Sequence, residues 1–381
     1  MRLVRLFAVV STLAGCAVIA ASYTPPPQAR EVFETSAGPV SVTRIVAGLE
    51  QPWAVAPLPA GGALITEKDA RLWHFDADWQ QQEVAGLPAV EVSGQGGLLD
   101  VTLARDFETS RRIYLTFSER AEDGLRTAMV TAMLSDDGAR LEDVRHLFRQ
   151  EPAMSGGRHF GSRVLEAADG TLFITTGDRG EPRTAQNLNL YQGKVIRLLP
   201  DGAPAPDNPF IGTAGAQPEI WSYGHRNIQG AALDDEGRLW TLSHGARGGD
   251  EINLAEAGKN YGWPVISYGT HYSGASIGEG TQKDGMEQPK WYWDPSIAPS
   301  GLLIHSGTAF PEWKGDLFAG ALKHDYIARL DREGDRIVGE EKLFESSYTR
   351  IRDIVEAPDG TIWFLAVGDG GLYRIAPAEG G

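Results

Sequence analysis

The feature that most constrains the fold is a turn followed by a short strand, which recurs six times along the chain. The predicted strands are rich in β-branched or aromatic residues and cover residues 63–66, 113–117, 171–175, 238–242, 316–319 and 361–365. Gly stands in the turn before five of the six strands, as Gly-Gly or Asp-Gly for example. Asp-Gly supplies the positive φ that tight hairpin turns require. We therefore expect an all-β chain built from repeated hairpin units.

The spacing of these units favours a ring. They start roughly 45–80 residues apart, which is long for a blade but compatible with insertions between strands. Closing four-stranded blades into a ring leaves only short sheet edges. Six units therefore predict a six-bladed β-propeller of four-stranded antiparallel blades with long functional loops. A pair of β-sandwiches is the alternative, and a (β/α) barrel is disfavoured because the intervening stretches show few convincing amphipathic helices.

Composition limits the classes of partner. The chain has 381 residues, of which 42% are hydrophobic and 23% charged, so it can bury a sizeable core. Its 35 Lys and Arg against 51 Asp and Glu give a net charge of −16. This charge disfavours nucleic acid and anionic membrane surfaces as partners, because both require clustered basic residues. A single Cys excludes internal disulfides and Cys-rich metal sites.

The N-terminus is predicted to be a secretory signal. Residues 1–21 carry Arg2 and Arg5 followed by a largely apolar run that ends in small residues. Cys16 follows Leu-Ala-Gly, which resembles a bacterial lipoprotein box. Plain cleavage near residues 20–22 is the alternative, because the residues after Cys16 remain apolar. Either reading predicts a periplasmic or secreted protein, whose membrane contact would be limited to a lipid anchor at Cys16.

These patterns also predict the domain boundaries. Residues 22–38 include three consecutive Pro and are interpreted as a linker. Residues 39–377 are expected to form one propeller domain, and residues 378–381 a short tail.

The unusual residues lie in loops between the predicted strands. The segments are 94–100, 156–163, 224–230, 244–253, 260–264, 320–323 and 350–353. Each alone has a plain structural explanation, such as a turn with a solvated Arg or a loop His with a satisfied ring. None matches a phosphate-binding loop or a dinucleotide fingerprint. Their recurrence on successive units of a ring favours one shared pocket, because the loops at the same end of each blade can face that pocket.

The residue types in these loops indicate the chemistry of that pocket. The cations Arg226, Lys323, Arg350 and Arg352 stand out in an acidic chain and suit a small polyanion. Asp250, Glu251 and the backbone carbonyls near Gly245 are hard oxygen ligands suited to calcium. His159 is a candidate general base near neutral pH. Together they suggest redox or hydrolytic work on a polar small molecule.

The motifs, in this order, resemble the soluble pyrroloquinoline quinone-dependent glucose/sorbosone dehydrogenases, most closely the bacterial aldose sugar dehydrogenases. The likeness covers roughly residues 40–376. Its most specific segments are Gly-His-Arg-Asn-Ile-Gln-Gly at 224–230, Gly-Gly-Asp-Glu-Ile-Asn at 248–253 and Asn-Tyr-Gly-Trp-Pro at 260–264. The resemblance implies a six-bladed propeller, which agrees with the independent count of units. It also implies oxidation of aldoses at C1 to lactones by hydride transfer to the quinone.

The resemblance assigns roles to individual residues. His159 matches the proton acceptor, and Arg226 matches the cation beside the reactive quinone oxygens. Asn227 matches a further cofactor contact. The remaining cofactor matches are Gln95, Lys323, Arg350, Arg352 and, more weakly, Tyr272.

Calcium is also implied by the resemblance. One ion would bridge the cofactor and the backbone carbonyls of Gly245 and Ala246, where it would act as a Lewis acid on the quinone. A second, structural ion present in some members would use Glu251 and Tyr261. Many relatives carry Pro where this chain has Ala246, so the loop is expected to be less rigid here.

Two other functions remain open from the sequence. A calcium-dependent propeller lactonase or related hydrolase would need its metal held by side chains at the channel centre. A non-catalytic carbohydrate-binding propeller would need no base beside Arg226. The sequence names neither the preferred sugar nor the electron acceptor, although the insert at 268–293 is expected to shape the substrate side.

Overall fold

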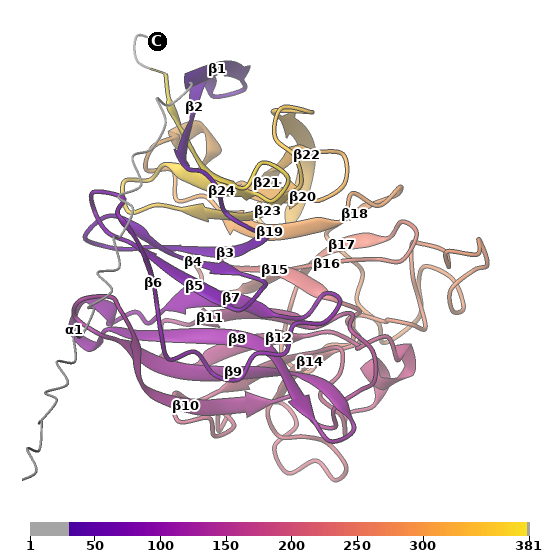
Figure 1. Cartoon of the computed structure of the whole chain (residues 1–381). Helices are drawn as coiled ribbons and strands as arrows, with labels where there is room; N and C mark the ends of the chain where they lie inside the picture. Colours follow the sequence, from indigo (N-terminus) through magenta and orange to yellow (C-terminus); the bar gives the residue numbers. More distant parts are fainter. Residues whose placement is uncertain (1–29, 379–381) are drawn as a thin grey trace, which may run out of the picture.

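The computed structural model describes residues 30–378, which form 25 strands arranged in six antiparallel sheets around a central axis (Figure 1). The predicted signal segment with Cys16 lies outside the described residues, as do residues 379–381. One four-residue α-helix, α1 (Phe107–Ser110), and two 3-10 turns, η1 (Pro182–Gln186) and η2 (Pro311–Trp313), complete the described elements. No helix within residues 30–378 is long and apolar enough to cross a membrane.

Five blades each consist of four consecutive strands. Blade 1 contains β3 (Pro52–Pro57), β4 (Ala63–Glu67), β5 (Arg71–Phe75) and β6 (Gln81–Glu83). Blade 2 contains β7 (Leu98–Leu103), β8 (Arg112–Ala121), β9 (Gly124–Leu134) and β10 (Leu141–Arg149). Blade 3 contains β11 (Gly161–Glu166), β12 (Leu172–Thr176), β13 (Lys194–Leu198) and β14 (Ile220–Tyr223). Blade 4 contains β15 (Ile228–Leu233), β16 (Leu239–Ser243), β17 (Asp250–Leu254) and β18 (Trp291–Trp293). Blade 5 contains β19 (Pro299–Ile304), β20 (Leu317–Ala321), β21 (Ile327–Glu333) and β22 (Arg336–Leu343).

The sixth blade joins the two ends of the chain. It contains β23 (Ile351–Glu356), β24 (Ile362–Ala366) and β25 (Gly371–Pro377) from the C-terminal end, and β2 (Gly38–Val46) and β1 (Arg30–Thr35) from the N-terminal end. β2 pairs with β25, and β1 pairs with β2. The predicted linker at 22–38 is therefore wrong for residues 30–35, because this segment finds a strand edge to pair with. Figure 1 shows β1 and β2 against the C-terminal strands.

The prediction of a six-bladed propeller is confirmed, and the sandwich and (β/α) barrel alternatives are wrong. The first strand of each blade lies nearest the axis, where β3, β7, β11, β15, β19 and β23 contact one another in a ring. Apolar side chains of neighbouring blades pack between the sheets, as Trp53 and Leu64 of blade 1 do with Leu98 and Phe117 of blade 2.

Every first strand carries a register shift near its start. One extra residue is accommodated between Pro52 and Ala54 in β3, and equivalent shifts occur in the other five first strands. The residues inside the shifts include Trp53, Asp100, Arg163, Gln229 and Arg352. A β-bulge bends its strand and redirects its side chains. The six bulges place these five side chains around the axis.

Hydroxyl groups of the second strands satisfy backbone N–H groups at these bulges. The Thr66 Oγ1 accepts a hydrogen bond from Ala54 N at 3.0 Å. Thr116 Oγ1 accepts one from Asp100 N, and Thr175 Oγ1 one from Arg163 N, each at 3.0 Å. A buried N–H group without a partner is costly, so these hydroxyls stabilise the irregular backbone. They also explain polar residues at buried positions of otherwise apolar strands.

Candidate active site

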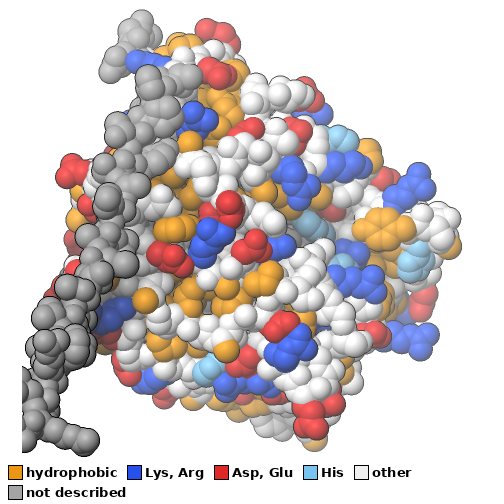
Figure 2. Space-filling view, viewed as in Figure 1, with side chains coloured by type: hydrophobic (Ala, Val, Ile, Leu, Met, Phe, Trp, Pro, Cys, Tyr) orange, Lys and Arg blue, Asp and Glu red, His pale blue; other side chains and the backbone are white. Residues whose placement is uncertain are grey.

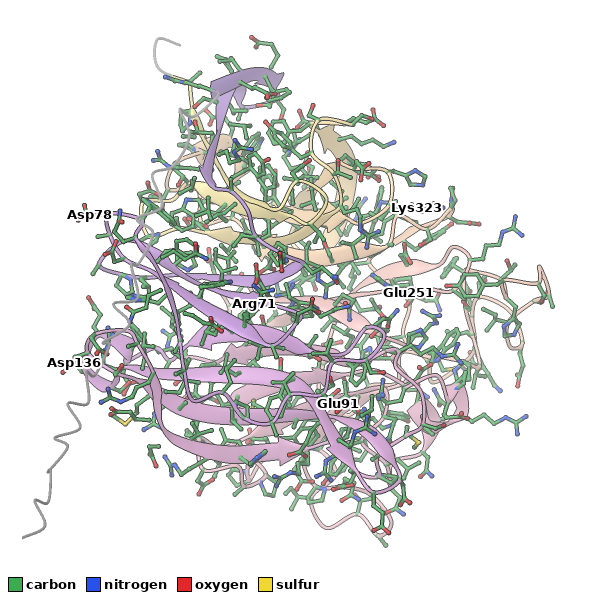
Figure 3. The ribbon with its side chains drawn as sticks, in the orientation of Figure 1. Arg71, Asp78, Glu91, Asp136, Glu251 and Lys323 are labelled. Atoms are coloured by element: carbon green, nitrogen blue, oxygen red, sulfur yellow. The ribbon has the colours of Figure 1, made fainter. Side chains whose placement is uncertain are left out.

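The predicted site residues gather where the first strands begin. A cavity of about 230 Å³ opens there. Its lining comprises Gln51, Pro52, Trp53, Lys68, Gly94, Gln95, Asn227, Gln229, His244, Leu322, Arg350, Arg352 and Val367. We call it the axial pocket. Figure 3 shows Lys323 and Glu251 toward the same end of the molecule, with Asp78 and Asp136 at the opposite end. Blue and pale-blue side chains are frequent at that end of the surface in Figure 2.

The axial pocket is positively charged although the protein is acidic. Lys68, Arg350 and Arg352 line it, and none of its described lining residues is Asp or Glu. The Arg350 guanidinium donates to Leu322 O at 3.3 Å, and the Lys68 ammonium donates to Gly94 O at 3.2 Å. These carbonyl contacts leave the positive charges uncompensated by acids. The pocket therefore suits an anion.

Arg226 and Asn227 lie at the edge of the axial pocket. Arg226 is 8% exposed, donates from Nη1 to His244 O at 3.2 Å, and has its Nε without a partner. Its guanidinium carbon lies 5.3 Å from the ring centroid of Trp263. Asn227 Oδ1 accepts hydrogen bonds from Gly161 N and Gln229 Nε2, each at 3.1 Å. Both residues are thus fixed by contacts between blades 3 and 4.

Two contacts hold His159. Its Nδ1 lies 2.6 Å from Asp178 Oδ1, and its backbone N donates to Gln95 Oε1 at 2.7 Å. Asp178 is fully buried, and its Oδ2 accepts a hydrogen bond from Trp263 Nε1 at 2.8 Å. Because the carboxylate engages Nδ1, the ring proton resides on Nδ1 and leaves the Nε2 lone pair free. This arrangement is that of an oriented general base.

The electrostatics of the pair fit that role. Burial lowers the pKa of His159 below its usual value; the Asp178 hydrogen bond opposes this shift, and the charge of Arg226 adds to it. Burial alone would raise the pKa of Asp178, but the hydrogen bond from His159 and further contacts hold it below its usual range. At neutral pH the imidazole is therefore neutral and the carboxylate ionised. The base is ready to accept a proton.

Backbone strain occurs at two of the site residues. His159 has φ of 55° and Arg350 has φ of 57°. Non-Gly residues rarely adopt this left-handed conformation, and such strain collects at functional sites. The surrounding contacts of His159 with Gln95 and Asp178 offset its cost.

Two predicted cofactor residues lie away from the pocket wall. Lys323 is exposed and follows Leu322, which lines the axial pocket. Lys323 itself lines none of the cavities described here. Tyr272 is 76% exposed in the loop between β17 and β18, and it lines none of the cavities described here. The structure thus brings together six of the predicted catalytic and cofactor residues and leaves Lys323 and Tyr272 outside the pocket wall. The six are His159, Arg226, Gln95, Asn227, Arg350 and Arg352.

The loop predicted to bind the first calcium ion is anchored by Asp250. Its Oδ1 accepts a hydrogen bond from Gly245 N at 2.8 Å. Its Oδ2 accepts hydrogen bonds from Ser296 Oγ, Ile297 N and Ala298 N at 2.7–3.0 Å. Asp250 therefore fixes the loop of Gly245 and Ala246 rather than offering a free carboxylate. Backbone carbonyls remain the donors that this loop could offer a cation.

The residues predicted for the second ion line a small cavity of about 20 Å³, which is the size of a single water molecule or ion. No Lys, Arg or His within residues 30–378 forms an ion pair with Glu251 across the cavity wall, and burial raises the pKa of Glu251 to about 7. Asn253, which also lines the cavity, is 1% exposed and its Oδ1 has no partner. The Tyr261 hydroxyl is occupied, since it donates to Leu254 O and accepts from Glu256 N. Only the backbone carbonyl of Tyr261 could serve as a ligand.

Several residues that shape the site were not predicted from the sequence. Asp178 lies in Gly-Asp-Arg directly after β12, and Trp263 lies in a motif whose individual role was not predicted. Trp53, Lys68 and Gln229 line the axial pocket. Asp178 follows a predicted strand, and this position could have signalled it. Lys68 and Trp53 lie outside any recognisable motif, so their place in the pocket is apparent only in the folded structure.

The chain is similar to known proteins over most of its length. The sequence profile described as glucose/sorbosone dehydrogenase matches residues 49–374. Aldose sugar dehydrogenase YliI of Escherichia coli strain K12 is 44% identical over 336 residues, which span 86% of this chain and 91% of that protein.

Two solved structures are similar to this chain over most of its length. The soluble aldose sugar dehydrogenase of E. coli in its apo form superposes with a TM-score of 0.86 at 42% identity, covering 89% of this chain and 100% of that chain. The PQQ-bound aldose sugar dehydrogenase of Streptomyces coelicolor has a TM-score of 0.73 at 27% identity, covering 88% of this chain and 98% of that chain. This protein belongs to the glucose/sorbosone dehydrogenase family.

Proposed function

We propose that the protein is a quinoprotein aldose sugar dehydrogenase that oxidises the anomeric carbon of an aldose to a lactone and passes the electrons to an external acceptor. One observation carries this proposal. A cationic pocket without acidic lining residues adjoins a His base that is oriented by a buried Asp. A propeller that only binds carbohydrate has no use for that base. The relatives named as aldose sugar dehydrogenases support the same activity.

The residues of the axial pocket fit pyrroloquinoline quinone, a tricarboxylate. Arg352 and Arg226 each present a buried Nε without a hydrogen-bond partner. Lys68 and Arg350 add charge at the pocket wall, and Lys323 is an exposed cation next to the lining residue Leu322. Guanidinium and ammonium groups are the usual partners of carboxylates. When bound, the quinone supplies a two-electron hydride acceptor. The protein supplies position and charge.

The side chains of this chain perform the proton chemistry. His159 Nε2 accepts the proton of the anomeric hydroxyl, while Asp178 holds the Nδ1 proton and stabilises the imidazolium that forms. Arg226 provides fixed positive charge where negative charge develops. Trp263 supports both partners, since it donates to Asp178 and packs against Arg226. Asn227 anchors the loop that carries Arg226.

We infer that calcium contributes at two places. The small cavity beside Glu251 suits one cation, because its carboxylate lacks a cation partner and Asn253 Oδ1 lacks a hydrogen bond. The carbonyls of Gly245 and Ala246 are candidates for an ion next to the axial pocket. Calcium should therefore raise the Tm of the protein, and Glu251→Gln should reduce that rise. An identical rise in wild type and variant would contradict the Glu251 site.

The decisive experiment uses the metal-free protein. Addition of pyrroloquinoline quinone and calcium should restore reduction of an artificial dye by glucose, and the absorption spectrum of the reconstituted protein should change when glucose is added. Quinone alone or glucose alone should give no dye reduction. Lactone hydrolysis in the absence of quinone would instead support the hydrolase. Failure of the wild type to bind quinone would end the proposal.

We also propose that the mature protein works in the periplasm or outside the cell. The support is the sequence pattern of residues 1–21. Cell fractionation of the full chain should find the protein outside the cytoplasm. The mass of the mature protein should distinguish lipidation at Cys16 from cleavage near residue 21, and Cys16→Ser should release the protein from membranes only in the first case. A full-length protein that stays in the cytoplasm would contradict the proposal.

A further inference from the structure

The deepest cation of the axial pocket has no acidic partner. Arg352 is 8% exposed, and its Nη2 donates to Gln229 Oε1 at 2.9 Å. Its Nε has no hydrogen-bond partner, and its guanidinium carbon lies 4.2 Å from the ring centroid of Trp53. Burial lowers the pKa of Arg352 to about 9. Charged groups are seldom buried without a counter-ion, so the absence of an acid at this position requires an explanation.

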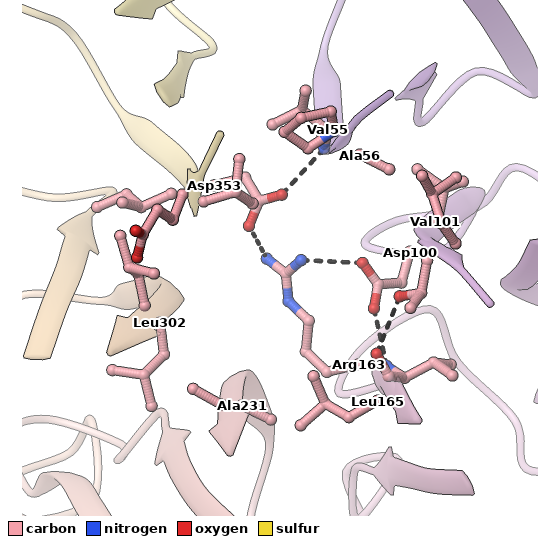
Figure 4. Close-up of a pocket in the computed structure, with 18 of the residues that line it drawn as sticks. Val55, Ala56, Asp100, Val101, Arg163, Leu165, Ala231, Leu302 and Asp353 are labelled. Atoms are coloured by element: carbon pink, nitrogen blue, oxygen red, sulfur yellow. Dashed lines mark hydrogen bonds and ion pairs between the residues drawn. The ribbon is translucent and has the colours of Figure 1, made fainter. Parts of the chain in front are cut away.

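An acid is available next to Arg352 but is engaged elsewhere. Asp353 Oδ1 binds Arg163 Nη2 at 2.8 Å, and Asp353 Oδ2 accepts a hydrogen bond from Val55 N at 3.0 Å. Arg163 also binds a second acid, because its Nη1 lies 3.0 Å from Asp100 Oδ1. Asp100 Oδ2 accepts from Val164 N at 2.8 Å. Figure 4 shows Arg163 between the two carboxylates.

The cluster of Asp100, Arg163 and Asp353 lies between two cavities. Asp100, Arg163 and Asp353 line a second cavity of about 460 Å³ that is lined by the first strands of all six blades. Trp53, Gln229 and Arg352 line the axial pocket instead. Arg163 spans the boundary, because its Nε donates to Gln229 O at 2.7 Å and its guanidinium carbon lies 4.4 Å from the Trp53 ring centroid. The acids thus face one cavity and the free cation faces the other.

We propose that Arg163 is a positioning residue for cofactor binding: it holds Asp100 and Asp353 on its own side of the axis, so that the charge of Arg352 remains available to an anion in the axial pocket. This inference rests on the proposed function. The four charges of Arg163, Arg352, Asp100 and Asp353 sum to zero. Loss of Arg163 would leave a net charge of −1, with Asp353 free to pair with its neighbour Arg352. An anionic cofactor would then meet a neutralised arginine.

The test measures quinone binding rather than turnover. Pyrroloquinoline quinone is titrated into purified protein at fixed calcium, and quenching of Trp fluorescence gives the Kd, since Trp53 lines the pocket. Arg163→Met should weaken binding about ten- to a hundredfold, the worth of one hydrogen bond to a charged group. Met keeps the apolar stem of the side chain. An unchanged Kd in a folded Arg163→Met protein would overturn the inference.

Removal of the acids should restore binding. In Arg163→Met/Asp100→Asn/Asp353→Asn no carboxylate remains to compete for Arg352, so the Kd should return to within about threefold of wild type. Neutral replacement of a buried charged cluster is often tolerated by the fold. Asp353→Asn alone, which keeps Arg163 and Asp100, should bind quinone at least as tightly as wild type. A role of the cluster in packing alone predicts weaker binding in both variants, and that result would refute the inference.

A matched control lies elsewhere in the chain. Arg197 is 7% exposed and binds Asp169 and Asp207, each at 2.8 Å, but it lines neither axial cavity. Arg197→Met should lower Tm and leave the Kd for quinone unchanged. If it weakens binding as much as Arg163→Met, the effect is a general loss of stability and the inference fails. A wild-type protein that does not bind quinone would contradict the proposed function instead.

Discussion

At the scale of single residues, the site depends on how His159 is held. Asp178 fixes its tautomer, Gln95 fixes its backbone, and its backbone adopts the left-handed conformation with φ of 55°. The sequence singles out His159 as a base and marks Asp178 only as a polar residue after a predicted strand. It does not show that the two pair, because they are 19 residues apart and meet only across the start of blade 3. Pairs of this kind depend on folding, which no local motif reveals.

Replacement of the base should separate chemistry from binding. His159→Ala should lower turnover by about two to four orders of magnitude, because a positioned base contributes that much, while the Kd for quinone stays near wild type.

Lys323→Ala should instead raise the quinone concentration needed for half-saturation, with little change in turnover at saturation. Dye reduction and fluorescence titration measure the two quantities. A His159→Ala enzyme with nearly normal turnover would mean that another group is the base.

The pH dependence should report the same residue. His159 accepts a proton only when neutral, so activity is lost as pH falls through its pKa. Burial lowers that pKa below the usual value of 6.5. The acid limb of kcat/KM should therefore lie below pH 6.5. Asp178→Asn removes the contact that opposes the shift, so the limb should move to still lower pH, with lower turnover because the tautomer is no longer held. An acid limb above pH 6.5 would contradict this assignment.

At the scale of elements, the six strands predicted from the sequence correspond to β4, β8, β12, β16, β20 and β24, the second strand of every blade. These strands are almost entirely buried and follow Gly-containing turns in most cases, so their pattern is strong. The first strands were not predicted as strands. Each has a bulge near its start, and all except β3 carry polar residues at or beside that bulge, which breaks the alternation that marks a regular strand.

The bulges themselves can be tested through their hydroxyl partners. Thr175→Val keeps the side-chain shape but leaves the N–H of Arg163 without its acceptor. The free energy of unfolding should fall by about 1–3 kcal/mol, the cost of one unsatisfied buried donor. Thr213, which is exposed, provides the control, and Thr213→Val should change stability by less than about 0.5 kcal/mol. Equal denaturation midpoints for both variants would show that the hydroxyl is dispensable.

At the scale of the whole molecule, stability depends on the closure of the sixth blade. β2 pairs with β25 along six residue pairs, and β1 adds contacts such as Phe33 against Phe344 at 4.8 Å between ring centroids. Ser36 also accepts a hydrogen bond from Trp313 Nε1 at 3.0 Å. The unpredicted strand β1 therefore reinforces the closure, whereas β2 completes it.

Two truncations should separate these contributions. A chain that begins at residue 37 lacks β1 and should fold, with a Tm lower by several degrees and unchanged quinone affinity. A chain that begins at residue 47 lacks β2 as well, exposes the edge of β25, and should be insoluble or unfolded. Thermal denaturation and size-exclusion chromatography compare both with a chain that begins at residue 22. A stable, monomeric protein without β2 would show that closure is not required.

The pairing of β2 with β25 has a consequence for biogenesis. The strand made almost first must wait, without its partner, until the last segment of the polypeptide has been synthesised. A nascent chain therefore cannot finish its ring early, and a prematurely terminated product always displays a bare edge. Ring closure is therefore a late step, in which the two ends of the polypeptide meet only after residues 371–377 have been synthesised.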